Sequence, residues 1–246
     1  MIDYYGILVV LVICGIMASV SQYLGIMTTA GNILAFVEGL IIGLASFTWL
    51  IVLLVFLLTS VAVTRYGFER KKAAGVQEGA KGERGWRNVA ANGAVPMFMA
   101  LLLLLFPDLL SYTGFSVLFI SSVAVAASDT TASEIGVLNP NTYLITTFKR
   151  VKAGVNGGIS TTGELWAFLA AAYTSAVAFF FLFFMDGVPF RPLIAAIPVV
   201  SGFLGCQIDS VIGATLENRG YIGKLGNNMV SIALGTLIAL ALFLFF

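Results

Sequence analysis

The sequence predicts an all-α integral membrane protein, a polytopic bundle of about seven or eight transmembrane helices forming a single domain over residues 1–246. Of its 246 residues, 59% are hydrophobic and only 10% are charged, a proportion that a water-soluble domain of this size cannot bury. The apolar runs are long and continuous, whereas the strands of a membrane barrel alternate apolar and polar residues. In hydrocarbon only helices or closed barrels satisfy the backbone, so each run is expected to be a helix.

The expected helices lie at about 4–21, 31–45, 47–65, 92–111, 114–128, 163–185, 190–213 and 229–246. The first run lacks the basic leader of a signal peptide, so it is expected to cross the membrane. The stretch from Gly31 to Thr64 is too long for one crossing and short for two. It is therefore expected to contain either a half-helix or a tight helical hairpin, with eight spans as the working count.

Positive charge predicts the orientation of these helices. Of the 13 Lys and Arg residues, seven lie in 65–87, three in 149–152, and two are Arg219 and Lys224. With eight spans, all of these residues fall on one side of the membrane and only Arg191 lies on the other. Because cytoplasmic loops carry the excess of Lys and Arg, this side is expected to be cytoplasmic and both termini to lie outside.

Composition also limits the chemistry. The chain has no histidine, which excludes imidazole as a base, a zinc ligand or a pH sensor. Cys14 and Cys206 lie in apolar runs, are too few for a disulfide framework, and are expected to be packing residues. Any reaction must therefore use carboxylates, hydroxyls, amides and cations.

Two polar segments in the first half of the chain are candidates for a site. The stretch 65–92 combines the Arg70-Lys71-Lys72 cluster with glycines, Asn88 and Asn92. The glycines and asparagines suit close approach of the backbone to a phosphate. A basic loop is also explained by its role in orienting the protein in the membrane or by contact with anionic lipids. Asp129 and Glu134, with hydroxyls between them, offer the oxygen ligands that Mg²⁺ prefers. A capped helix end explains that second segment as well.

Two further segments lie in the second half. The stretch 149–164 joins a cationic cluster to a glycine-rich loop that leads into a helix, an arrangement that binds anions, but it is not a Walker A loop. Thr161 and Glu164 also fit a capping box there. Asp209 is embedded in an apolar run, which makes it a functional candidate by default. Glu38 is embedded too, without an evident local partner, and is compatible with a structural role.

In combination, these segments resemble the phytyl-phosphate kinase family, which comprises vitamin E pathway enzymes and their archaeal, bacterial and animal relatives. The resemblance covers nearly the whole chain and rests on ordered motifs: Gly67 to Lys72, Trp86-Arg87-Asn88-Val89, Ala91-Asn92-Gly93, Ser128-Asp129-Thr130, Ser133-Glu134-Ile135-Gly136, Gly157 to Gly163, Asp209 to Thr215, and Asn227-Asn228. Relatives tend to have glutamine where this chain has Glu217.

The resemblance implies transfer of a phosphoryl group from a nucleoside triphosphate, CTP by analogy with other prenol-activating membrane kinases, to an isoprenyl monophosphate such as phytyl or geranylgeranyl phosphate. The expected cofactor is Mg²⁺, held by Asp129, Glu134 and Asp209. The expected catalytic residues are Asp129, Asp209, Lys72 and Arg87. Contacts with nucleotide and phosphate are expected from a larger polar set: Arg70, Lys71, Asn88, Asn92, Lys149, Asn156, Gly157, Gly158, Ser160, Ser210, Asn227 and Asn228. Membrane lipids are expected partners, nucleic acids are not, and a homo-oligomer is compatible with the sequence.

Two alternative functions are consistent with the same residues. The embedded Asp209 and Glu38 and the interrupted helix after Gly31 also suit a transporter of a small solute or ion, although such proteins place binding groups near the midplane and carry inverted repeats. A cytidylyltransferase that joins CTP to a lipid phosphate would use similar metals and loops. The kinase interpretation requires that Asp129, Gly157 and Asp209 meet near one membrane surface.

Overall fold

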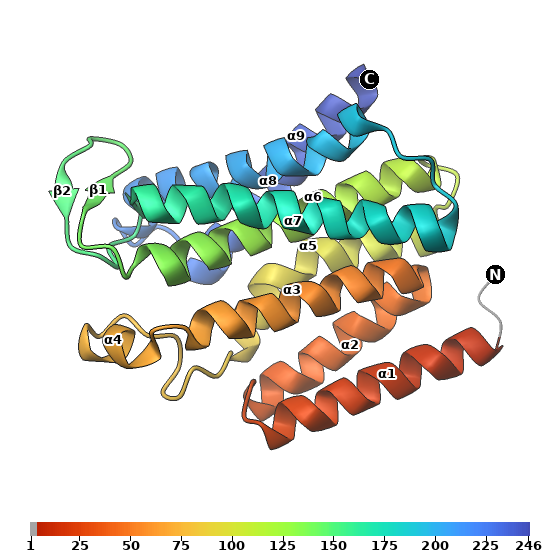
Figure 1. The fold of residues 1–246 in the computed structure, drawn as a ribbon, viewed down its shortest axis with the longest axis horizontal. Coiled ribbons are helices and arrows are strands. Elements are labelled where there is room, and N and C mark those ends of the chain that lie inside the picture. The colour runs from red at the N-terminus through yellow and green to blue at the C-terminus, as the bar shows by residue number, and fades with distance from the viewer. Residues whose placement is uncertain (1–3) are drawn as a thin grey trace.

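The computed structural model describes residues 4–246, and its long helices run back and forth along one axis (Figure 1). The helices in this part of the chain are α1 Tyr4–Tyr23, α2 Thr29–Ala45, α3 Phe47–Arg65, α4 Phe68–Ala73, α5 Trp86–Leu105, α6 Tyr112–Gly136, α7 Thr161–Asp186, α8 Pro192–Ile212, the π-helix η1 Gly213–Glu217, and α9 Lys224–Phe245. The strands are β1 Thr142–Leu144, β2 Arg150–Val151 and β3 Gly158–Ile159, in the antiparallel order β2-β1-β3.

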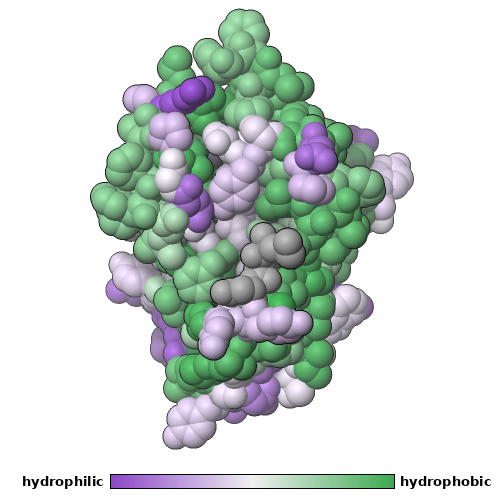
Figure 2. Space-filling view, turned by 90° about the vertical axis from the view of Figure 1, so that its right-hand side faces the viewer, coloured by the Kyte–Doolittle hydropathy of each residue, from purple (hydrophilic) through white to green (hydrophobic). Residues whose placement is uncertain are grey.

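Seven helices between residues 4 and 246 are long and apolar enough to cross a membrane, which confirms the predicted polytopic helical bundle. Their outward faces carry large apolar side chains, among them Leu8, Phe183 and Leu237. Figure 2, which views the end of the bundle that carries the termini, shows apolar residues over most of the visible surface. The bundle is thus built to be surrounded by lipid.

The doubtful region 31–65 forms two helices joined by a single residue. The backbone N–H of Ser46 donates to the carbonyl of Ile42 at 2.9 Å, and its Oγ accepts from the N–H of Trp49 at 3.3 Å. Ser46 therefore ends α2 and begins α3, because one residue satisfies orphan backbone groups on both helices. Of the two alternatives, the tight hairpin is the one present, and α2, at 17 residues, is shorter than the seven helices long enough to span a membrane.

Helix α6 is the centre of the bundle and contacts α3, α5, α7, α8 and α9. In its most apolar 18 residues, 89% are buried, whereas the other candidate spans reach 17–39%. Its sequence is rich in serine and alanine, the small residues that let helices approach closely in a membrane.

Val125 of α6 packs between glycines of two neighbouring helices. A Cβ placed on Gly205 of α8 would lie 2.5 Å from Val125 Cγ2, and a Cβ placed on Gly235 of α9 would lie equally close to the same atom. No larger residue fits at either position without displacing Val125. This contact fixes the positions of α6, α8 and α9 along the bundle axis relative to one another.

The polar segments lie together at the end opposite the termini (Figure 1). That end carries α4, the loop that leads to α5, the small sheet and the turn after η1, so it holds the three basic segments named above. Arg191 precedes α8 at the other end. The predicted segregation of charge is therefore present in the fold.

Three helices extend further into this polar end than hydropathy indicates. α5 begins at Trp86, α6 continues to Gly136, and α9 begins at Lys224, so each gains one or two turns. These added turns contain Asn88, Asp129 and Asn227, which line cavities and do not face lipid. A hydropathy pattern ends where polar residues begin, whereas the helix continues wherever neighbouring helices enclose it.

We predict that Gly205→Ala destabilises the protein, because the new methyl group must displace Val125. Overpacking of this kind costs about 1–3 kcal/mol, and each kcal/mol corresponds to roughly 2–4 °C in Tm for a chain of this size. Thermal unfolding in detergent measures the effect. Gly15→Ala on α1 is the matched control, since a Cβ there meets nothing within 4 Å. A Gly205→Ala protein as stable as the wild type would contradict the packing described.

Candidate functional site

A polar cavity of about 320 Å³ opens at the end of the bundle that carries α4 and the sheet. Its walls come from the α4–α5 connection, α6, the glycine-rich loop before α7, α8, η1 and α9. Asp129, Gly157 and Asp209 all line it, although they lie far apart in the chain. The convergence on which the kinase interpretation depends is therefore present. The other predicted residues that line the cavity are Glu134, Asn156, Gly158, Ser160, Ser210, Asn227 and Asn228.

Asp129 of α6 and Asp209 of α8 form the acidic centre of the cavity, and their charges act on each other. Asp129 Oδ2 accepts from Asn228 Nδ2 at 3.3 Å, and Asp209 Oδ1 accepts from Ser231 Oγ at 3.0 Å. Neither aspartate forms an ion pair with any residue that the structure describes, and the charges of Lys224 and Arg84 act on Asp129 only from a longer distance. Two neighbouring carboxylates without an ion-pair partner are an arrangement that a bound cation would stabilise.

The oxygen atoms around this pair fit Mg²⁺. Asn227 donates its Nδ2 to the carbonyl of Asp209 at 3.2 Å and to Glu217 Oε2 at 3.1 Å, while its Oδ1 is buried without a hydrogen-bond partner. Within residues 4–246 no group of three or more His, Cys, Asp or Glu side chains could hold a metal. That is compatible with Mg²⁺ carried by a nucleotide, because this ion commonly takes one or two protein carboxylates and completes its shell with phosphate oxygens and water.

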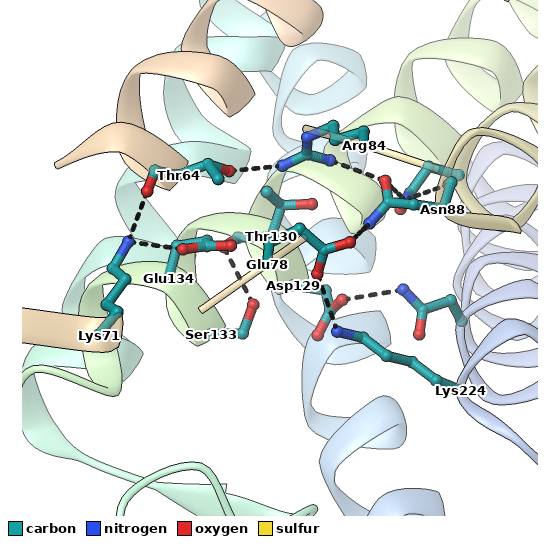
Figure 3. Close-up of polar contacts among 12 residues, drawn as sticks. Thr64, Lys71, Glu78, Arg84, Asn88, Asp129, Thr130, Ser133, Glu134 and Lys224 are labelled. Atoms are coloured by element: carbon teal, nitrogen blue, oxygen red, sulfur yellow. Dashed lines mark hydrogen bonds and ion pairs between the residues drawn. The ribbon is translucent and has the colours of Figure 1, made fainter. Parts of the chain in front are cut away.

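Glu134, the third predicted metal ligand, lies on the cavity wall but is paired with Lys71 (Figure 3). Lys71 Nζ lies 2.5 Å from Glu134 Oε2 and also donates to the carbonyls of Val63 at 2.8 Å and Thr64 at 3.2 Å. The Lys71 side chain is fully buried, so its three N–H donors are engaged inside the protein. This ion pair connects α4 and the end of α3 to α6, and it occupies two groups for which phosphate and metal binding were predicted.

The glycine-rich loop lies directly against the end of α8. Gly157 has a φ of 76°, and a Cβ there would lie 2.5 Å from both Ala214 Cβ and the carbonyl oxygen of Ser210. Asn218 Nδ2 donates to the carbonyl of Asn156 at 3.0 Å and holds the same loop from the other side of η1. Only glycine combines this backbone conformation with so close an approach. The loop is thereby held beside Asp209.

Ser160 anchors the other end of this loop as the N-cap of α7. Its Oγ accepts from the N–H of Gly163 at 3.2 Å and donates to the carbonyl of Gly136 at 3.2 Å. The capping box expected from Thr161 and Glu164 is therefore wrong by one residue, since Ser160 precedes the helix and Thr161 is already its first residue. Glu164 accepts instead from Gln207 Nε2 at 2.7 Å on α8.

Four charged residues that line the cavity were not among the predicted site residues: Lys224, Glu78, Glu164 and Glu217. Lys224 Nζ lies 3.6 Å from Glu78 Oε2, and its side chain is 68% exposed (Figure 3). Glu78 Oε1 accepts from Asn88 Nδ2 at 3.2 Å. The signal available for Lys224 was its spacing of three and four residues before Asn227 and Asn228, which places all three on one face of a helix.

The remaining predicted residues lie outside the polar cavity. Arg70, Lys72, Arg87 and Lys149 are exposed and do not line it, and the Arg87 guanidinium lies 5.5 Å from the centre of the Trp86 ring. Asn88 and Asn92 line a second, apolar cavity.

Arg84, which was not predicted, is buried beside Asn88 and Asn92. Its Nη1 donates to Asn88 Oδ1 at 2.9 Å and its Nη2 donates to Thr64 Oγ1 at 3.0 Å. Burial lowers the pKa of the Arg84 guanidinium from its ordinary value, and the nearby carboxylates oppose that shift. A guanidinium stays charged under these conditions, so Arg84 places a positive charge between the two cavities.

Comparisons with known proteins agree with this architecture. The model of a family described as integral membrane protein DUF92 matches residues 11–239. The chain is 33% identical over 198 residues to an uncharacterized membrane protein of Methanocaldococcus jannaschii, MJ0933, covering 80% of this chain and 77% of that protein. It is 32% identical over 184 residues to the chloroplastic protein VTE6 of Arabidopsis thaliana, covering 73% and 54%, and 30% identical over 234 residues to protein PGR of the same plant, covering 83% and 79%.

No solved structure matches the chain. The family match includes every residue that lines the polar cavity, from Gly75 to Asn228. The chain belongs to the integral membrane protein DUF92 family, in agreement with the resemblance to the phytyl-phosphate kinases that its motifs carry.

Proposed function

We propose that this membrane protein is a prenyl-phosphate kinase, which transfers a phosphoryl group from a nucleoside triphosphate, CTP in the first instance, to an isoprenyl monophosphate at the cytoplasmic face. One observation carries the proposal. Asp129 and Asp209 lie side by side in a polar cavity that also contains the Gly157 loop and Lys224. Membership of a family that includes VTE6 supports the same reaction class.

The residues of the cavity suit phosphoryl transfer because that reaction needs positioning and charge neutralisation more than covalent catalysis. Mg²⁺, when bound with the nucleotide, supplies positive charge to the phosphate oxygens. Asp129 and Asp209 would hold that ion. Lys224 and the backbone N–H groups of Asn156 and Gly157 would bind the anionic oxygens from the other side, whereas the N–H of Gly158 donates to the carbonyl of Val155 at 2.9 Å.

The reaction balances without a histidine. An oxygen of the acceptor monophosphate attacks the γ-phosphorus, the bond from that phosphorus to the β–γ bridging oxygen breaks, and a nucleoside diphosphate leaves. Since the second pKa of a phosphate monoester is about 6, the attacking oxygen is largely ionised at neutral pH and no general base is required. The lack of histidine in this chain is therefore compatible with the proposal.

The position of the acids favours this function over transport. Asp129 lies seven residues from the end of α6, and Asp209 lies eight residues from the end of η1, which continues α8 to Glu217, so both lie in the half of their helices toward the polar end of the bundle. Transporters typically bind their substrates near the midplane, between inverted repeats. A cytidylyltransferase would use the same groups, and only its products distinguish it.

We expect purified protein with Mg²⁺, a nucleoside triphosphate and phytyl or geranylgeranyl monophosphate to form the prenyl diphosphate and a nucleoside diphosphate. Mass spectrometry of lipid and nucleotide products over a panel of CTP, ATP, GTP and UTP measures this and identifies the donor. A CDP-linked lipid with pyrophosphate would establish the cytidylyltransferase instead. Absence of turnover with every lipid phosphate would contradict the kinase and leave transport as the alternative.

Asp129→Asn and Asp209→Asn should each lower kcat by roughly a hundredfold or more, the scale of removing one preorganised electrostatic contact from a transition state. Amide groups keep the size of the carboxylates, so both variants should unfold at temperatures near that of the wild type. Asp108→Asn is the matched control, because Asp108 is exposed in the connection between α5 and α6 at the opposite end. Full activity in either site variant would remove that aspartate from the mechanism.

Lys224→Met should raise the KM for the nucleotide by about 10- to 100-fold, which corresponds to losing one charged hydrogen bond of about 1.5–3 kcal/mol. The side chain is mostly exposed, so the substitution should leave folding unchanged. Lys224→Arg should retain much of the affinity, and Arg219→Met, on an exposed neighbour outside the cavity, should have no effect. An unchanged nucleotide KM in Lys224→Met would show that Lys224 does not contact phosphate.

A further inference from the structure

A second cavity, of about 90 Å³, lies between α1, α2, α3 and α5. Most of its surface is apolar and comes from side chains such as Met17, Phe36, Leu53, Leu54 and Leu57. Along α3 it extends from Ser60 to Leu50, ten residues or about 15 Å at 1.5 Å per residue. We call it the apolar cavity.

One wall of the apolar cavity is polar. Arg84 precedes α5 by two residues, and Asn88 and Asn92, four residues apart, follow on one face of that helix. Four buried polar atoms that line the cavity have no hydrogen-bond partner, namely Ser21 Oγ, Ser60 Oγ, Arg84 Nε and Asn92 Oδ1. Buried polar atoms are rarely left unpaired, because each costs about 1–3 kcal/mol. The lining of the apolar cavity therefore contains hydrogen-bond donors and acceptors whose partners a bound ligand could supply.

Glu38 adds a further polar group without a partner. Its side chain is 4% exposed and makes no hydrogen bond or ion pair within residues 4–246. A Cβ on Gly93 would overlap its carboxylate, so the glycine in the Asn92-Gly93 pair makes room for Glu38 beside Asn92. The polar wall therefore continues across the cavity from α5 to α2.

Hydrogen bonds connect the polar wall of the apolar cavity to the polar cavity. Asn88 accepts from Arg84 and donates to Glu78, and Glu78 lines the polar cavity beside Lys224 (Figure 3). A phosphate bound at Arg84 and Asn88 would thus lie on the row of side chains that leads to the Asp129 region.

We propose that the apolar cavity binds the hydrocarbon chain of the lipid-phosphate acceptor, and that Arg84 and Asn88 receive its phosphate at the polar wall. The identity of this lipid rests on the proposed kinase function. Gly39 limits chain length, because it lies at the far end, where a Cβ would be 3.3 Å from Cys14 Sγ and 3.9 Å from Leu50 Cδ1. A chain longer than the cavity would have to displace packed side chains at this end, and overpacking of this kind costs about 1–3 kcal/mol.

The arrangement of α1 provides a route from the bilayer. α1 packs chiefly against α2, and only 17% of its most apolar 18 residues are buried, the lowest fraction among the candidate spans described. A lipid that remains in the membrane therefore reaches the cavity by passing beside α1 and does not have to expose its chain to water.

Photo-crosslinking tests the location without requiring turnover. The probe is geranylgeranyl monophosphate with a diazirine at the end remote from the phosphate, added to the full-length protein in nanodiscs, and the adducts are mapped by mass spectrometry. We expect them in α1, α2 and the first half of α3, near Cys14, Gly39 and Leu50. Adducts confined to lipid-facing surfaces, such as the phenylalanine-lined groove between α7 and α8, would overturn the proposal.

Gly39→Leu tests the role of Gly39 in chain length, with Gly15→Leu as the matched control, since a Cβ at Gly15 meets nothing within 4 Å. Gly39→Leu should lower crosslinking by the C20 probe at least tenfold and spare an analogous C5 probe, whereas Gly15→Leu should change neither. Equal loss of both probes, or no loss, would overturn the assignment. Unlabelled phytyl phosphate should reduce crosslinking by the probe more than phosphatidic acid does. If phosphatidic acid reduced it equally well, the cavity would not be selective for a single prenyl chain. A wild-type protein that crosslinks as expected but makes no diphosphate would contradict only the proposed kinase.

Discussion

The packing of Val125 between Gly205 and Gly235 is the contact on which the candidate site depends. In a bilayer, lipid competes equally well for apolar side chains, so helices associate through close packing at small residues. Each of these three residues lies one helical turn from a polar group of the cavity: Asp129 follows Val125 by four residues, Asp209 follows Gly205 by four, and Ser231 precedes Gly235 by four. Fixing the packing therefore fixes the positions of the two carboxylates relative to each other and to Ser231.

A second set of contacts builds the rest of the cavity around that centre. The positive φ and tight packing of Gly157 hold its loop against the end of α8, while the buried pair of Lys71 and Glu134 holds α4 against α6. Neither aspartate forms an ion pair with a residue that the structure describes, and Lys224 pairs with Glu78 on the cavity wall with most of its side chain exposed.

The sequence was sufficient for the fold class and for the convergence of Asp129, Gly157 and Asp209, because hydropathy, charge bias and motif order all report on which membrane side a segment occupies. For residues 31–65 it left a half-helix and a tight hairpin open. The sequence did not predict which groups the individual charged side chains contact. Lys71, Arg84 and Glu78 belong to one basic, glycine-rich segment, yet the first is buried against Glu134, the second separates two cavities and the third pairs with Lys224. Such differences depend on contacts between distant segments, which spacing along the chain does not encode. The helix ends at Trp86 and Gly136 were missed for a related reason, since enclosed polar turns resemble loops in hydropathy.

Binding of Mn²⁺, in place of Mg²⁺, in the presence of a non-hydrolysable CTP analogue tests the central claim most directly, because electron paramagnetic resonance counts the bound ion without requiring turnover. If Asp129 and Asp209 hold one nucleotide-bound ion together, each single asparagine variant should weaken Mn²⁺ binding and the double variant should lose little more than either alone, since contacting residues are not additive. Independent, additive losses, or Mn²⁺ binding unchanged in either single variant, would contradict a shared site.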